Sequence, residues 1–296
     1  MTTIILSIVA FIVLCFFIFL WVLYCISFSP MKRFVNDPRR IPRNEQYDKI
    51  RDEMFILIDE LEKEPCEKIS TFSYDNLRLS ARYYDRGNDS LIEIDFHGYR
   101  GHALRDYCGG SKISRQDKRN AIIIDQRSHT DSKGRAITFG IKERFDVLSW
   151  VDYTISRFGK DVKIILSGIS MGAATVLMAS ELDLPKNVIG IIADCPYTSP
   201  KDIICKVSKD KGLPVKLIYP LVKLSAKIFA NADIDAASPI EAVKHTNIPI
   251  LIIHGDDDRY VPYHMGKEVF EACASENKRF LSVKNAGHGV SFFEDR

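Results

Sequence analysis

The sequence predicts an α/β protein with a mainly parallel eight-stranded sheet and helices on both faces. Between residues 91 and 284, short apolar runs alternate with longer amphipathic stretches, a pattern typical of parallel sheets. The segment Gly168-Ile169-Ser170-Met171-Gly172 sets a serine between two glycines where a strand passes directly into a helix. Hydrophobic residues make up 46% of the chain and charged residues 27%, which suffices for a large packed core.

The N-terminus predicts a single-pass membrane anchor over residues 1–29. Ile4 to Phe28 are 25 consecutive residues without a charge, more than the ~20 needed to cross hydrocarbon. A cleaved signal peptide would need a basic start and a small-residue cleavage site, and neither is found. Five basic residues follow the span, so we expect the rest of the chain in the cytoplasm: Lys32, Arg33, Arg39, Arg40 and Arg43.

Residues 30–65 read as a linker followed by an amphipathic helix. The linker is polar and contains three prolines, and five apolar residues then recur at helical spacing: Ile50, Met54, Leu57, Ile58 and Leu61. A catalytic domain is expected over 66–296. Its predicted strands are 68–74, 77–84, 91–96, 121–125, 162–167, 188–194, 248–254 and 279–284. Its predicted helices are 102–115, 141–158, 171–182, 238–244 and 263–274.

Residues 196–247 interrupt the alternation of strands and helices. The segment is unusually apolar and longer than a simple crossover needs. Either a small helical cap over the site or a longer crossover helix in the core fits this pattern. We expect the cap, which would define the substrate pocket.

The glycine-flanked Ser170 is the predicted nucleophile. At the tip of a strand-turn-helix the serine takes a strained backbone conformation with φ above zero. The neighbours two residues away must be tiny so that strand and helix can approach each other. The hydroxyl then stands clear of the sheet beside a helix N-terminus, whose free N–H groups attract an anion.

A serine nucleophile needs a base and an orienting carboxylate. His288 lies between glycines just after the last predicted strand, where a core-packing role is not expected. The acid is one of three consecutive residues, Asp256, Asp257 and Asp258, which follow the strand ending at His254. The other histidines are assigned structural or solvated roles: His97 and His254 brace loops, while His102, His129, His245 and His264 are expected to be solvated.

An oxyanion hole requires two backbone donors. The N–H of Met171, directly after the nucleophile, is the first. The second is expected in His97-Gly98-Tyr99-Arg100-Gly101, which follows the strand 91–96, and we assign it to the N–H of Tyr99.

Four motifs together resemble the α/β-hydrolase superfamily over residues 66–296: HGYRG at 97–101, GISMGAAT at 168–175, HGDDDRYVP at 254–262 and AGHG at 286–289. The resemblance is to serine-aminopeptidase-like and acylglycerol-lipase-like hydrolases, often with an N-terminal anchor. It implies the chain order serine, acid, histidine and selects Asp258 as the acid.

The segment 125–130 is similar to the family's D-x-R-G-H-G. Ser128 and Thr130 replace its glycines, which implies a less tight loop, and Arg127 is expected to form structural ion pairs. The chain ends eight residues after His288, which implies a short or missing final helix.

The sequence therefore predicts a serine hydrolase that cleaves a carboxylic ester or thioester, with a small, apolar acyl-containing substrate. A serine aminopeptidase or an acyltransferase on the same residues, and more remotely a non-catalytic membrane scaffold, are the alternatives. For an aminopeptidase, Glu143, Asp146 or Asp183 would have to hold the substrate amine.

No metal or organic cofactor is expected. Nucleic-acid binding is not expected either, because the net charge is +2 and no basic stripe is present. The pattern carries no information on oligomeric state.

Overall fold

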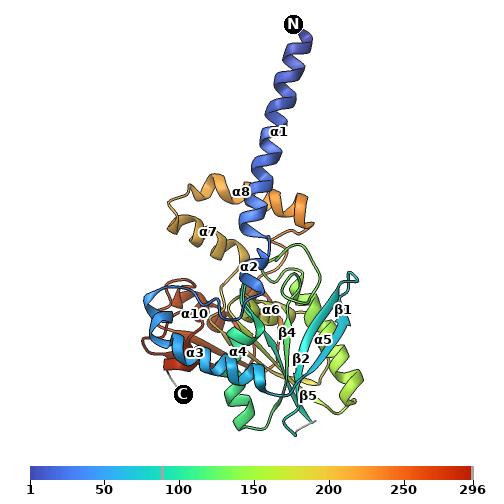
Figure 1. The fold of residues 1–296 in the computed structure, drawn as a ribbon, viewed down its shortest axis with the longest axis vertical. Coiled ribbons are helices and arrows are strands. Elements are labelled where there is room, and N and C mark those ends of the chain that lie inside the picture. Colours follow the sequence, from blue (N-terminus) through green and yellow to red (C-terminus); the bar gives the residue numbers. More distant parts are fainter. Residues whose placement is uncertain (88–89, 295–296) are drawn as a thin grey trace.

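The computed structural model describes residues 1–87 and 90–294 and contains one eight-stranded sheet (Figure 1). Its strand order is β1-β2-β4-β3-β5-β6-β7-β8. β1 and β2 are antiparallel, β2 is antiparallel to β4, and every other neighbouring pair is parallel. The strands are β1 (Glu67–Phe72), β2 (Arg78–Tyr84), β3 (Leu91–Phe96), β4 (Asn120–Asp125), β5 (Lys163–Ile169), β6 (Val188–Asp194), β7 (Ile250–Gly255) and β8 (Lys278–Val283). All eight predicted strands are found, with ends within two residues of the prediction.

The predicted helices are found, together with others for which no bounds were predicted. They are α1 (Thr2–Ser27), α2 (Lys32–Val35), α3 (Glu45–Lys63), α4 (Ala103–Gln116), α5 (Glu143–Phe158), α6 (Met171–Ala179), α7 (Pro200–Asp210), α8 (Val215–Ser225), α9 (Pro239–Ala242), α10 (Tyr263–Ala272) and α11 (Ser291–Glu294), with a π-helix η1 (Ala226–Ala230) and a 3-10 turn η2 (Val243–His245). α6 ends three residues before the predicted Leu182, because the chain already turns there, with the Leu182 N–H bonded to the Ala179 carbonyl.

Helices cover both faces of the sheet, and β4 shows how. Ile122 and Ile124 point into a cluster with side chains of α5 and α6. Ala121 and Ile123 point into a second cluster with side chains of α3 and α4. A strand buried on both faces reads as a continuous apolar run, which is why the central strands lack polar alternation.

The N-terminal helix α1 projects far from the sheet (Figure 1). It is long and apolar enough to cross a membrane, and little of its apolar stretch is buried. Its last turns behave differently. Leu20, Tyr24 and Phe28 are buried, and Tyr24 and Phe28 share a hydrophobic cluster with side chains of α6, α7 and α8. The end of α1 is therefore packed against the body of the protein. We refer to residues 196–247, which contain α7, α8, η1 and α9, as the helical insertion.

Candidate active site

Ser170 occupies the sharp turn between β5 and α6. Its backbone has φ 56° and ψ −113°, so the predicted strained conformation is found. The flanking glycines are required by close approach. A Cβ on Gly168 would lie 2.3 Å from the backbone of Gly172, and a Cβ on Gly172 would lie 1.7 Å from the carbonyl oxygen of Phe96. Strand, turn and helix thus meet at contacts that no side chain permits.

The structure brings three predicted residues into one hydrogen-bonded chain. The Ser170 Oγ lies 2.9 Å from Nε2 of His288, and His288 Nδ1 lies 2.7 Å from Oδ2 of Asp258. A carboxylate only accepts hydrogen bonds, so Nδ1 carries the proton and Nε2 is free to accept the serine hydroxyl. This is the orientation that a general base requires.

Of the three consecutive aspartates, Asp258 alone faces the histidine. Its second oxygen accepts the N–H groups of Tyr260 and Val261, at 2.9 and 2.8 Å. Asp256 instead accepts the N–H of Asn285, and Asp257 pairs with the exposed Arg259. The assignment that came from the family pattern is therefore the one whose geometry fits.

Charges around the imidazole favour its protonated form. Burial lowers the pKa of His288, but the charge of Asp258 and its hydrogen bond outweigh this and raise the pKa above its ordinary value. Burial raises the pKa of Asp258, yet His288 and His254 together hold it well below the ordinary value. A further carboxyl, Asp194 at the end of β6, also contributes to the raised pKa of His288. Burial raises the pKa of Asp194 itself to about 6.

The loop His97–Gly101, which carries the second predicted oxyanion donor, lies beside the nucleophile. Within residues 1–87 and 90–294, the N–H groups of Tyr99 and Met171 donate to no other residue. The loop is braced as predicted for His97: its Nε2 accepts the N–H of Gln126 and its Nδ1 bonds the Gly98 carbonyl. The N–H of Gly98 donates to the Asp106 carboxylate at 2.9 Å. An oxyanion needs two free N–H donors. Met171 directly follows the serine, and Tyr99 lines the same cavity as Ser170.

The same loop is tied to the end of the N-terminal helix, a contact that the sequence did not predict. The Tyr99 hydroxyl donates to the Ser27 carbonyl at 2.9 Å. The Arg100 Nη2 donates to the carbonyls of Ile26 and Ser29, each at 2.8 Å. A guanidinium on the last carbonyls of a helix satisfies acceptors that lack partners within the helix and complements its dipole.

The histidine loop is held from another N-terminal segment. The Tyr47 hydroxyl, on the first turn of α3, donates to the carbonyl of His288 at 3.0 Å. Its neighbour Gln46 donates through Nε2 to the Asp257 carbonyl and packs tightly over Gly287. The described part of α11 covers Ser291–Glu294, and these α3 contacts help to fix the loop beside it. Residues before 66 thus contribute to the site, which sequence reasoning missed. The N-capping Asn44 before Tyr47 is a sequence signal that locates this turn.

Two expectations about neighbouring residues were wrong. His102 and His129 are buried rather than solvated. His102 accepts the N–H of Leu104 at the start of α4, and His129 packs edge-on against His97. The loop at 125–130 is not loosened either, because Ser128 and Thr130 adopt the positive φ (70° and 42°) that glycines would take there.

Arg127 forms structural ion pairs, as predicted. Its guanidinium pairs with Asp146 at 2.6 Å and with Asp75 at 3.0 Å. The Asp146 carboxylate is thus engaged by Arg127. The Glu143 carboxylate accepts three hydrogen bonds from Thr138 and Gly140. Neither is available for a substrate amine.

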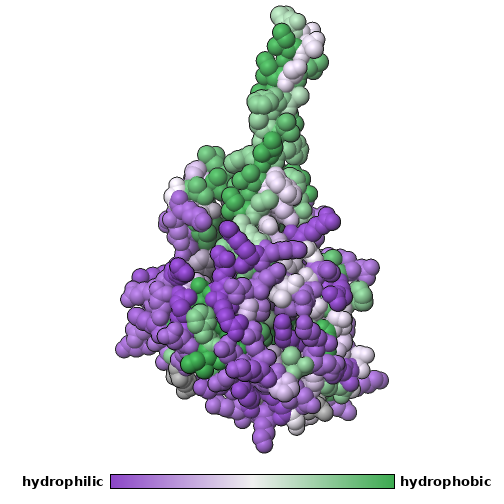
Figure 2. Space-filling model, in the orientation of Figure 1, coloured by the Kyte–Doolittle hydropathy of each residue, from purple (hydrophilic) through white to green (hydrophobic). Residues whose placement is uncertain are grey.

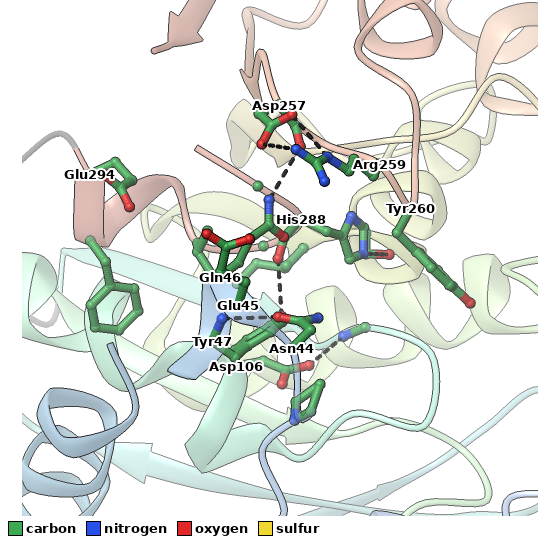
Figure 3. Close-up of a pocket in the computed structure, with 18 of the residues that line it drawn as sticks. Asn44, Glu45, Gln46, Tyr47, Asp106, Asp257, Arg259, Tyr260, His288 and Glu294 are labelled. Carbon is green, nitrogen blue, oxygen red and sulfur yellow. Dashed lines mark hydrogen bonds and ion pairs between the residues drawn. The ribbon is translucent and has the colours of Figure 1, made fainter. Parts of the chain in front are cut away.

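A cavity of about 620 Å³ opens beside the serine, between the start of α3 and the loops that carry Asp258 and His288 (Figure 3). Its wall contains apolar groups such as Met54, Ile169 and Phe293. It also contains charged side chains, of which the acidic and the basic ones are nearly equal in number. Several of these charges neutralise one another, as in the pair Asp257–Arg259. The cavity is amphipathic rather than simply apolar.

Three possible metal ligands also lie together: atoms of Cys195, Asp258 and His288 fall within 4.8 Å of one another. Both nitrogens of His288 are already engaged, one with Asp258 and one with Ser170. Burial raises the pKa of the Cys195 thiol well above its ordinary value, which keeps it protonated and a poor ligand. The arrangement fits a proton-transfer chain better than a metal centre.

The chain resembles known hydrolases in sequence. Residues 210–295 match the family model described as serine aminopeptidase, S33. The chain is 24% identical over 178 residues to the uncharacterized protein YqkD of Bacillus subtilis, covering 60% of this chain and 58% of that protein. It is 27% identical over 178 residues to the lysophosphatidylserine lipase ABHD12 of Danio rerio, covering 58% and 43%. The chain thus spans about half the length of the curated relatives it matches.

Solved structures agree on the fold. The Pyrococcus furiosus esterase Pf2001 superimposes with a TM-score of 0.61 at 21% identity, covering 88% of this chain and 92% of that one. Est1E of Butyrivibrio proteoclasticus, with ferulic acid bound, gives 0.57 at 19% identity, covering 74% and 90%. The acylaminoacyl peptidase of Pyrococcus horikoshii gives 0.56 at 14% identity, covering 78% and 39%. The chain therefore has the α/β-hydrolase fold, and its resemblance to the serine-aminopeptidase-like and lipase-like members of that superfamily is confirmed.

Proposed function

We propose that the protein is a membrane-anchored serine hydrolase that cleaves a carboxylic ester through an acyl-enzyme. The observation that carries this proposal is the hydrogen-bonded chain Ser170–His288–Asp258 with its serine on a strained strand-to-helix turn. Strain of this kind persists where the surrounding structure enforces it and is concentrated at functional sites.

The reaction follows from this geometry. The Ser170 Oγ attacks the carbonyl carbon while Nε2 of His288 accepts its proton, and the carbonyl oxygen becomes an oxyanion beside the N–H groups of Tyr99 and Met171. The carbon–oxygen bond to the alcohol then breaks, and the alcohol leaves with the proton from His288. Water attacks the acyl-enzyme while His288 takes its proton. The bond between the acyl carbon and the Ser170 Oγ then breaks as His288 returns that proton to Oγ, and the carboxylic acid leaves. The negative Asp258 stabilises the imidazolium in both halves.

The substrate class we favour is a single-chain acyl ester with a polar head. A cavity that mixes apolar side chains with charges of both signs suits such an amphiphile better than a purely apolar ester. The similarity to lysophosphatidylserine lipases supports the same class. The aminopeptidase alternative has less support, because Glu143 and Asp146 are engaged elsewhere and the exposed Asp183 is not part of the cavity wall.

For location, we propose that α1 crosses the membrane once and that the catalytic domain lies in the cytoplasm. The apolar length of α1 and the basic residues that follow it support this orientation. Protease added to sealed inverted vesicles should digest the catalytic domain. Protection of the domain there would reverse the orientation.

The function is tested by labelling the full chain with a fluorophosphonate probe. The wild type and Ser70→Ala, which alters an exposed serine on β1, should be labelled, whereas Ser170→Ala should not. Hydrolysis is then compared across p-nitrophenyl esters of rising chain length, lysophospholipids and aminoacyl anilides. Labelling that survives in Ser170→Ala refutes the nucleophile assignment, and a preference for anilides refutes the ester assignment.

A further inference from the structure

Four exposed apolar residues lie along α8 and the chain on either side of it. Leu217 and Leu224 are seven residues apart on α8, which places them on one side of that helix. Leu213 lies just before α8, and Ile228 lies on η1. All four are exposed, Leu217 by 68%. The opposite side is packed: Val222 and Ala226 are buried in the cluster that holds Tyr24 and Phe28. α8 thus uses one side for the core and presents a second apolar side outward.

Lysines flank these four residues. Lys209, Lys211, Lys216 and Lys227 are exposed on the same stretch of chain. Apolar side chains bordered by lysines are typical of helices that lie in a membrane interface. The lysine stems extend along apolar surface while their amines reach the anionic headgroups.

The point at which α1 becomes buried bears independently on the depth of α8. The insertion begins to cover α1 at Leu20, which is buried, and Trp21 packs edge-to-face on Phe229 of η1 with centroids 5.1 Å apart. The uncovered part of α1, Thr2–Phe19, measures ~27 Å, close to the ~30 Å of hydrocarbon. A bilayer placed over this part of α1 ends at the level of α8 and η1.

The arrangement of the elements agrees with this depth. α8 runs across α1 rather than along it (Figure 1), so a bilayer pierced by α1 would lie flat against α8. The apolar surface of α1 continues onto the neighbouring insertion, whereas the rest of the visible face is mainly hydrophilic (Figure 2). α7 precedes α8 directly and contributes Lys206 to the cavity wall. One short segment thus joins the outward apolar residues to the cavity.

We propose that residues 213–228, which include α8 and part of η1, form a second membrane contact. Leu213, Leu217, Leu224 and Ile228 would lie at the edge of the hydrocarbon nearest the catalytic domain, with the flanking lysines among anionic headgroups. This contact would hold the cavity wall at the membrane surface, where an amphiphilic ester resides. It rests on the membrane-anchored hydrolase proposed above, and the occupant we commit to is a bilayer that contains anionic lipid.

The contact is tested by photocrosslinking of the full chain. The protein is reconstituted in vesicles of equal parts phosphatidylcholine and phosphatidylglycerol, with benzoylphenylalanine in place of Leu217. Matched variants carry the probe at Phe11, exposed on α1, and at Ile56, exposed by 59% on α3. We expect lipid adducts by mass spectrometry at positions 217 and 11 and none at 56.

The outcomes separate the two proposals. An adduct at 11 but not at 217, or crosslinks from 217 to a second protein chain, overturns the α8 contact and leaves the anchor intact. No adduct at 11 overturns the anchor and the α8 contact together. Neither readout depends on catalysis, so fluorophosphonate labelling tests the hydrolase separately.

A second experiment measures ester hydrolysis by Leu217→Asp, with Ile56→Asp as the control. We expect Leu217→Asp to lower hydrolysis of an ester embedded in vesicles by about fivefold or more, because it removes apolar area that the proposed contact buries in the bilayer. Hydrolysis of a short water-soluble ester and fluorophosphonate labelling should be unchanged. Equal losses on both substrates, or a similar loss in Ile56→Asp, would overturn the proposal.

Discussion

Ser170 and His288 meet in one hydrogen bond, yet the protein positions them by different means. The turn at Ser170 is fixed by backbone contacts between β3, β5 and α6, where the flanking glycines leave no room for a side chain. The loop at His288 has backbone contacts with the aspartate loop, and it is held in addition by flexible side chains from α3, namely Gln46 and Tyr47. The loop that carries Tyr99 resembles the second case, because it is tied to the end of α1.

The nucleophile is therefore fixed by the sheet itself, whereas the loops of His288 and Tyr99 depend in part on N-terminal segments outside the sheet. Changes at the turn should therefore be severe and structural. Changes at the two loops should be graded and should alter catalysis more than folding.

Of these substitutions, Asp258→Asn should reduce activity most. Asparagine preserves the size of the side chain but removes the charge that orients and stabilises the imidazole, so kcat should fall by about 10³–10⁴-fold. Circular dichroism should show an unchanged fold. Asp257→Asn, which alters a neighbour paired with Arg259, is the control and should retain most activity.

Gly172→Ala tests the rigid region. The added Cβ would meet the Phe96 carbonyl at 1.7 Å, which requires backbone movement, and we expect a loss of about 3 kcal/mol or more in the free energy of unfolding. Thermal denaturation measures it. Gly190→Ala is the matched control, since its Cβ would lie 3.7 Å from the nearest atom. Equal stability of the two variants would refute a sterically enforced turn.

Arg100→Ala tests the tie between the Tyr99 loop and α1. We expect kcat to fall about tenfold with little change in KM, because an oxyanion donor acts in the transition state rather than in substrate binding. Arg100→Lys, which keeps the charge without the planar fork, should recover part of the loss. Arg279→Ala, at an exposed position on β8, should have no effect. A change confined to KM would contradict a positioning role.

The smallest effect is expected for Tyr47→Phe, which removes the hydrogen bond to the His288 carbonyl. Such a bond contributes about 1 kcal/mol, so kcat/KM should fall by up to ~fivefold. Tyr153→Phe removes a hydroxyl bonded to Arg157 on an exposed face of α5 and serves as the control. A loss as large as that of Asp258→Asn would show that this loop is as rigidly coupled as the serine turn.

The contrast between the serine turn and the loops of His288 and Tyr99 also explains which features could be predicted from the sequence. The residue pattern that marks the serine turn lies within five consecutive positions, and the strands are marked by local apolar runs, so both were predicted closely. The ties from Tyr47 to His288 and from Arg100 to Ile26 join residues 241 and 74 positions apart. Each is a side chain bonded to a backbone carbonyl, and any residue supplies a carbonyl. No residue pattern marks such contacts. The burial of His129 was missed for the same reason, since nothing in its own segment signals that another loop covers it.

The most direct test of the account is the rate of fluorophosphonate labelling as a function of pH, in the wild type and in Asp258→Asn. Only the neutral imidazole accepts the serine proton, so labelling should rise as pH increases through the pKa of His288. That pKa is raised in the wild type, so the midpoint should lie above the ordinary histidine value of about 6.5. Removing the Asp258 charge should move the midpoint to lower pH and slow the labelling overall. Labelling that does not vary with pH, or an unchanged midpoint in Asp258→Asn, would contradict the proposal that Ser170, His288 and Asp258 act as one catalytic unit.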